Sequence, residues 1–144
     1  MTVGRRLQRN ERGVAAIEAA FALPILIVMI WAFVQLAQVF RATAGIQQAL
    51  GEGARYATLC IDPSTTTGCS SPSTDEVKTK IEQSVYGIGP GNFEDPPPSV
   101  TAGTSGTSRY YDLTVTYSQS TNLLIFPGPT MTVSRSKRVW LANN

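Results

Sequence analysis

Residues 13–34 read GVAAIEAAFALPILIVMIWAFV, and this stretch decides the fold. Its one charged residue is Glu18, and the apolar character continues, diluted by Gln35 and Gln38, as far as Phe40. A helix rises about 1.5 Å per residue, so roughly 20 apolar residues span the hydrocarbon core of a bilayer, which is about 30 Å thick. The sequence therefore predicts a transmembrane helix over residues 14–40.

Glu18 needs an explanation, because a charged side chain costs about 2.5 to 3.5 kcal/mol at the bilayer centre and less near the interface. One interpretation is that the side chain reaches back to the lipid headgroups. The other depends on a cut after Gly13, which would give Val14 a free cationic amine four residues from Glu18. Glu18 would then neutralise this amine in its own chain or in an adjacent subunit, and such pairing favours side-by-side packing of helices.

The basic leader, Gly13 at the cut position and Glu18 as the fifth residue of the mature chain resemble the substrates of prepilin peptidases. The segment GVAAIEAAFALP, residues 13–24, resembles the TadE-like minor pseudopilins of the Tad (tight adherence, Flp-type) pilus system. A weaker similarity to the carboxyl-terminal part of these proteins covers residues 124–129 and 132–135. Ala19 departs from the aromatic residue that many Tad prepilins carry after the glutamate.

The resemblance implies a minor pseudopilin or assembly factor, because the major Flp pilin is little more than a helix and this chain adds about a hundred residues. It also implies three partners: a prepilin peptidase, other pilins or pseudopilins, and the inner-membrane assembly platform of the pilus. The alternative is a permanently anchored extracytoplasmic binding module that never enters a filament.

Charge predicts the orientation. Arg5, Arg6, Arg9 and Arg12 against Glu11 give the leader, residues 1–13, a net charge of +3, and basic flanks stay cytoplasmic. Without the leader, eight basic and nine acidic residues remain, so the mature chain offers no basic surface for nucleic acid. A cleaved secretory signal is the competing interpretation, but its apolar region of about 7–15 residues is shorter than this one.

Small residues recur beyond the predicted membrane segment. Ala42, Gly45, Ala49, Gly53 and Ala57 follow one another at spacings of three or four, which places them on one stripe of a helix continuing over residues 41–60. Such a stripe lets helices of neighbouring subunits approach closely. The alternative, favoured from Ala49 onward, is that it packs on the chain's own domain. Pro24 removes a backbone donor and favours a bend in the membrane segment.

Cys60 and Cys69 flank a turn-rich octapeptide. In an exported domain the default expectation is a disulfide, contributing about 2 to 3 kcal/mol for so short a loop. A metal site would need further ligands, and the chain contains no histidine. The sequence predicts no cofactor, no metal and no catalytic site, since phosphate-binding and nucleophile motifs are also missing.

For residues 61–144 the sequence predicts a small, pilin-like α+β domain. Residues 73–76 have the spacing of a capping box, with Ser73 or Thr74 at the start of the helix and Glu76 bonding back. A short amphipathic helix follows, with Gly87 as its stop. Residues 111–117 alternate as a half-buried strand does, and their tyrosines are assigned to packing on the long helix rather than to a ligand. Further strands are predicted at 99–102 and 130–141, with Pro127-Gly128-Pro129 in the connection before the last.

Overall fold

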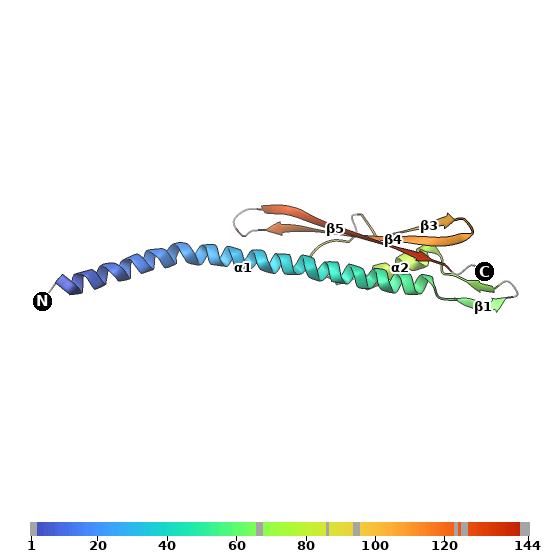
Figure 1. Cartoon of the computed structure of the whole chain (residues 1–144), viewed down its shortest axis with the longest axis horizontal. Coiled ribbons are helices and arrows are strands. Elements are labelled where there is room, and N and C mark those ends of the chain that lie inside the picture. Colours follow the sequence, from blue (N-terminus) through green and yellow to red (C-terminus); the bar gives the residue numbers. More distant parts are fainter. Residues whose placement is uncertain are drawn as a thin grey trace.

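The computed structural model describes residues 3–65, 68–85, 87–93, 96–122, 124 and 127–141, with the backbone alone at 3–12, 62–65, 68 and 69. A long helix carries a small domain on its second half (Figure 1). The elements are α1 (Val3–Ala57), β1 (Asp62–Thr65), β2 (Gly68–Ser70), α2 (Thr74–Val85), β3 (Ser99–Ser105), β4 (Ser108–Asn122) and β5 (Pro127–Trp140). The predicted α+β fold, a long apolar helix with a short helix and an antiparallel sheet, is confirmed.

Helix α1 runs without interruption through Pro24 and bends gently in its first half (Figure 1). It ends at Ala57, three residues before the predicted end at residue 60. The amides of Thr58 and Leu59 close the final turn by donating to the carbonyls of Arg55 and Tyr56, at 3.2 and 3.0 Å. These bonds satisfy carbonyl groups that the end of a helix leaves without partners.

Helix α2 begins with the predicted capping box. The amide of Ser73 donates to Glu76 Oε2 at 2.8 Å, and the amide of Glu76 donates to Ser73 Oγ at 3.3 Å, so two amides at the start of the helix are satisfied reciprocally. Gly87 follows the helix with φ +79°, a conformation that glycine adopts without steric cost. Both predicted boundaries of this helix are confirmed.

Strands β3, β4 and β5 form one antiparallel sheet in the order β3-β4-β5, and β1 pairs with β2 in a separate hairpin. The first of the three extends to Ser105, beyond the predicted Ala102. The prediction that Pro127-Gly128-Pro129 connects two strands is wrong, because β5 begins at Pro127, which pairs with Asn122. An edge strand tolerates proline since one side of its backbone needs no ladder donor.

The core lies between the sheet, α2 and the second half of α1. The inward residues of β4, Tyr111, Leu113, Val115 and Tyr117, are all buried, as the predicted alternation requires. Their partners on the helices include Ala42, Ile46, Ala49, Leu50, Val77 and Ile81, each at most 3% exposed. The amphipathic strand therefore packs on the long helix, as predicted.

Candidate functional site

Helix α1 presents an uncovered apolar surface from Gly13 to about Trp31. Val14 is 64% exposed, Phe21 71% and Ile25 68%, and none of the 18 residues in the most apolar window of the helix is buried. The mean hydropathy of that window is 2.4, and the helix is long and apolar enough to cross a membrane. So large an exposed apolar surface marks contact with lipid or protein, and a single helix of this kind fits membrane anchoring.

The predicted processing residues lie at the start of this surface. A Cβ atom built on Gly13 would meet no other atom within 4 Å, so the backbone there is open. Glu18 is exposed on the same continuous helix. Val14 and Glu18 are four residues apart and so lie on one face, one turn from each other. The cut itself and the pairing of the new amine with the carboxylate stay predictions.

The small-residue stripe packs on the chain's own domain. Ala42 and Ala49 are fully buried, and a Cβ on Gly45 would lie 2.6 Å from Ile88 Cδ1. A Cβ on Gly53 would lie 2.5 Å from Ile81 Cγ1, so glycine is what allows α1 and α2 to come this close. The domain-packing alternative therefore describes the whole stripe, including its first two members, and a role in contacts between subunits stays a prediction.

A polar contact joins the β4–β5 hairpin to the middle of α1, and we call it the clasp (Trp31, Gln35, Gln38, Gln119 and Asn122). Trp31 Nε1 donates to the Asn122 carbonyl at 2.7 Å. Gln35 also donates to this carbonyl and accepts from the Asn122 amide at 3.0 Å. Gln119 Nε2 donates to Gln38 Oε1 at 3.0 Å.

The clasp was not predicted from the sequence, although two glutamines in the apolar run indicate a polar contact. Gln35 and Gln38 interrupt the apolar run at a spacing of three, which places them on one face of the helix. Gln35 is only 7% exposed, and a buried amide needs hydrogen-bond partners. The three helix residues of the clasp lie inside the predicted membrane segment, residues 14–40, so the domain and the predicted membrane helix overlap there.

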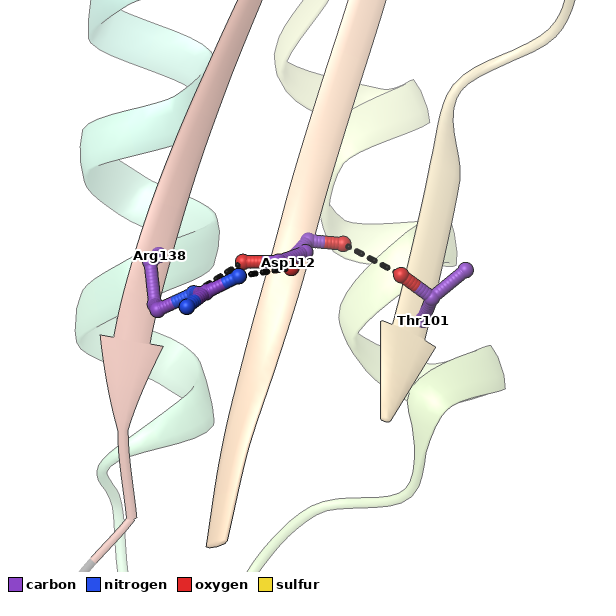
Figure 2. Close-up of polar contacts among 3 residues, drawn as sticks. All are labelled: Thr101, Asp112 and Arg138. Carbon is purple, nitrogen blue, oxygen red and sulfur yellow. Dashed lines mark hydrogen bonds and ion pairs between the residues drawn. The ribbon is translucent and has the colours of Figure 1, made fainter. Parts of the chain in front are cut away.

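Ion pairing and aromatic packing organise the sheet face turned away from the helices. In Figure 2, Arg138 on β5 faces Asp112 on β4, with Nε donating to Oδ1 at 2.8 Å and Nη2 to Oδ2 at 2.7 Å. The Arg138 guanidinium also lies 4.0 Å from the centroid of the Tyr110 ring, which meets the Trp140 ring edge-on at 5.2 Å. This bidentate geometry, with two parallel hydrogen bonds, is the strongest arrangement of an arginine–carboxylate pair.

Acidification should weaken the domain through this pair. The hydrogen bonds from Arg138 lower the pKa of Asp112 below its ordinary value of 3.8. A carboxylate with a lowered folded-state pKa stabilises the fold above its unfolded pKa and loses that contribution as the pH falls through the folded one. We therefore expect Asp112→Asn to lower the melting temperature of the full chain in detergent micelles near neutral pH, with the difference shrinking below about pH 4.

Asp75→Asn is the matched control, since Asp75 is an exposed aspartate outside this pair. Thermal unfolding followed by circular dichroism from pH 3 to 7 measures both variants. A difference between Asp112→Asn and the unmodified chain that is constant over this range would contradict the assignment.

The remaining predicted site is the disulfide. Strand β1 follows Cys60 and β2 contains Cys69, and the amide of Ile61 donates to the carbonyl of Ser70 at 3.1 Å. The two cysteines thus lie on adjoining segments of one hairpin. The side chain of Cys69 lies outside the described residues, so the bond itself stays a prediction. Among the side chains that are described, no three acids or cysteines gather as metal ligands.

Comparison with known proteins links part of the chain to a family. No curated protein and no solved structure matches the chain. A family model described as TadE-like protein matches residues 13–55, a range that begins at the predicted cleavage residue and ends two residues before the end of α1. The helix of this chain, from the uncovered apolar half through the stripe that carries the domain, is therefore similar to the TadE-like family of the Tad pilus system, as its sequence predicts.

Proposed function

We propose that this protein is a minor pseudopilin or assembly factor of a Tad-type, type IVb-like pilus. It acts in pilus biogenesis and surface adhesion, held in the bacterial inner membrane by α1 with its α+β domain in the periplasm. The observation that carries the proposal is where the family match falls. It covers residues 13–55 of α1, which include the apolar surface that the protein's own domain leaves uncovered.

Processing precedes assembly in this proposal. A prepilin peptidase cuts after Gly13, and the new amine of Val14 meets a carboxylate. The nearest one along the helix is Glu18, on the same face. When helices pack side by side, Glu18 of one subunit pairs with the amine of the next, because an unpaired charge in an apolar environment is costly. Pairing between subunits thus gives the charge a partner and sets the stagger of the helices.

The proposed action is noncovalent throughout. The apolar half of α1 packs among other pilins or pseudopilins and against the inner-membrane platform. The domain is attached to the second half of α1 by its core and to the middle of the helix by the clasp. It therefore presents its outer sheet face in a constant orientation to other pilus components, and no cofactor takes part.

Glu18→Ala tests this role in the native membrane. Insertion should survive, because the segment becomes more apolar. The amount of other Tad components recovered with the full chain should fall, by about tenfold if pairing contributes about 1.4 kcal/mol. The measurement is quantitative co-purification after detergent extraction, normalised to the amount of chain in the membrane.

Two variants separate the charge from the side chain. Glu18→Gln keeps the size of the side chain and removes its charge, so it should behave like alanine. Ile17→Ala shortens an exposed neighbour, 62% exposed, and leaves the carboxylate, so recovery should fall far less than with the Glu18 variants. Undiminished recovery with both Glu18 variants would remove the pairing role. Absence of any Tad component from the unmodified chain's eluate would favour an anchored binding module that stays outside the filament.

A further inference from the structure

One leucine at the tip of the β4–β5 hairpin has an unusual backbone. Leu124 has φ +68° and is the one residue other than glycine with a positive φ in the described part of the chain. Its side chain is 55% exposed, so packing within the chain does not explain why leucine stands where glycine or asparagine would be less strained. A strained and exposed apolar side chain suggests a contact outside the protein.

The clasp determines where this tip lies. Asn122, two residues before Leu124, is bonded through its backbone to Trp31 and Gln35, and its side chain accepts from the Leu124 amide at 3.1 Å. The hairpin runs along α1 as far as the middle of the helix (Figure 1). Leu124 therefore lies beside the turn of α1 that contains Trp31, where the uncovered apolar surface ends.

The spacing along α1 puts this turn at a membrane boundary. From Gly13 to Trp31 the helix rises about 27 Å, close to the hydrocarbon thickness of a bilayer. Tryptophan is enriched at the interface, where its ring meets lipid and its N–H finds a polar partner. Trp31 is 41% exposed and has such a partner in the Asn122 carbonyl.

Both elements lack charge around the tip. Helix α1 has no charged residue between Glu18 and Arg41, and the hairpin has none from Leu113 to Ser134. The residues between Asn122 and Pro127 are Leu123, Leu124, Ile125 and Phe126, of which the structure describes Leu124. A hairpin that is free of charge and carries the exposed Leu124 beyond its strands suits the bilayer interface better than bulk water.

We propose that the hairpin tip is a second membrane contact, in which Leu124 enters the interface of the outer leaflet beside Trp31. The strands themselves stay above the hydrocarbon. In the described structure β5 pairs only with β4, so the backbone donors and acceptors on its open edge would find no hydrogen-bond partners in lipid. The hydrocarbon span then ends near Trp31 rather than at residue 40. The proposal rests on membrane anchoring through α1 and holds whether or not the chain enters a pilus.

Fluorescence quenching in phosphatidylcholine vesicles tests this contact on the full chain. Trp31 and Trp140 are its two tryptophans, so Trp140→Phe reports Trp31 alone and Trp31→Phe reports Trp140 alone. Leu124→Trp in a chain with both replaced by phenylalanine reports the tip, which Gln35 still holds. Lipids brominated near the upper end of the acyl chains should quench Trp31 and the residue 124 reporter to a similar degree, and severalfold more than Trp140.

A second measurement leaves the clasp intact. In the Trp140→Phe chain, Leu124→Asp should shift Trp31 emission to longer wavelength, because the tip leaves the interface and admits water. Thr107→Asp, in the exposed turn at the opposite end of β4, should leave the emission unchanged.

Three results would overturn the proposal. The first is that the tryptophan introduced by Leu124→Trp is quenched no more than Trp140, although Trp31 is quenched. The second is an unquenched reporter with short-wavelength emission, which means contact with a second copy of the chain. The third is an unquenched Trp31, which means that α1 does not place this turn at the interface. None of these depends on recovery of Tad components, so failure here and failure of the pilus role are distinguishable.

Discussion

Gly13→Leu should leave the full leader on the chain, whereas the unmodified chain should start at Val14. Leucine adds a side chain at the bond to be cut, and a glycine there allows the close backbone approach that a peptidase needs. The fold should not change, because nothing lies within 4 Å of a Cβ at this position. Intact mass and amino-terminal sequencing of protein recovered from its native membrane measure the result, and the expected difference is all or none.

Gly51→Leu is the control for this experiment. Gly51 is on the same helix, and a Cβ there also meets nothing within 4 Å, so this variant should be processed like the unmodified chain. An unmodified chain that retains Arg5 to Arg12 would contradict prepilin-type processing. A membrane-anchored domain that keeps its leader would then be the better account.

Gly53→Leu should unfold the domain or come close to it. A Cβ at this position would lie 2.5 Å from Ile81 Cγ1 and 3.1 Å from Leu113 Cδ2, and both of these side chains are fully buried. Overpacking by a few methylene groups costs about 1–3 kcal/mol, and leucine adds a whole side chain. We expect a loss of about 3 kcal/mol or more, a large part of the stability of so small a domain.

Urea unfolding of the full chain in micelles, followed by tryptophan fluorescence, measures this loss. Gly51→Leu is again the matched control, because it has open space and should gain up to about 1 kcal/mol from better helix propensity. Equal stability of the two variants would show that α1 and α2 are not held as closely as the structure has them.

The parts of the fold that depend on near neighbours in sequence were predictable. The capping box of α2 joins residues three apart, and the buried face of β4 follows from an alternation of period two. The long apolar helix follows from composition alone. Gly13, Val14 and Glu18 were located by resemblance, and the family match over residues 13–55 confirms the resemblance rather than the roles.

Contacts between distant residues were not predictable. The clasp joins Gln35 to Asn122, 87 residues apart, and nothing in the pattern around either residue identifies the other. Pro127-Gly128-Pro129 has the composition of a turn, but it forms the start of an edge strand because Asn122 pairs with Pro127. In each case the partner is set by the register between elements.

The sequence by itself determined that this chain has an apolar amino-terminal helix with a lone carboxylate near its start, followed by an α+β domain. Periodicity, charge and composition carry that information along the chain. Only the tertiary structure decided that the small-residue stripe packs on the chain's own domain and that the β4–β5 hairpin reaches Trp31. The reason is physical: a stripe of small residues favours any close partner, and which one it meets depends on how the sheet and α2 dock on the helix.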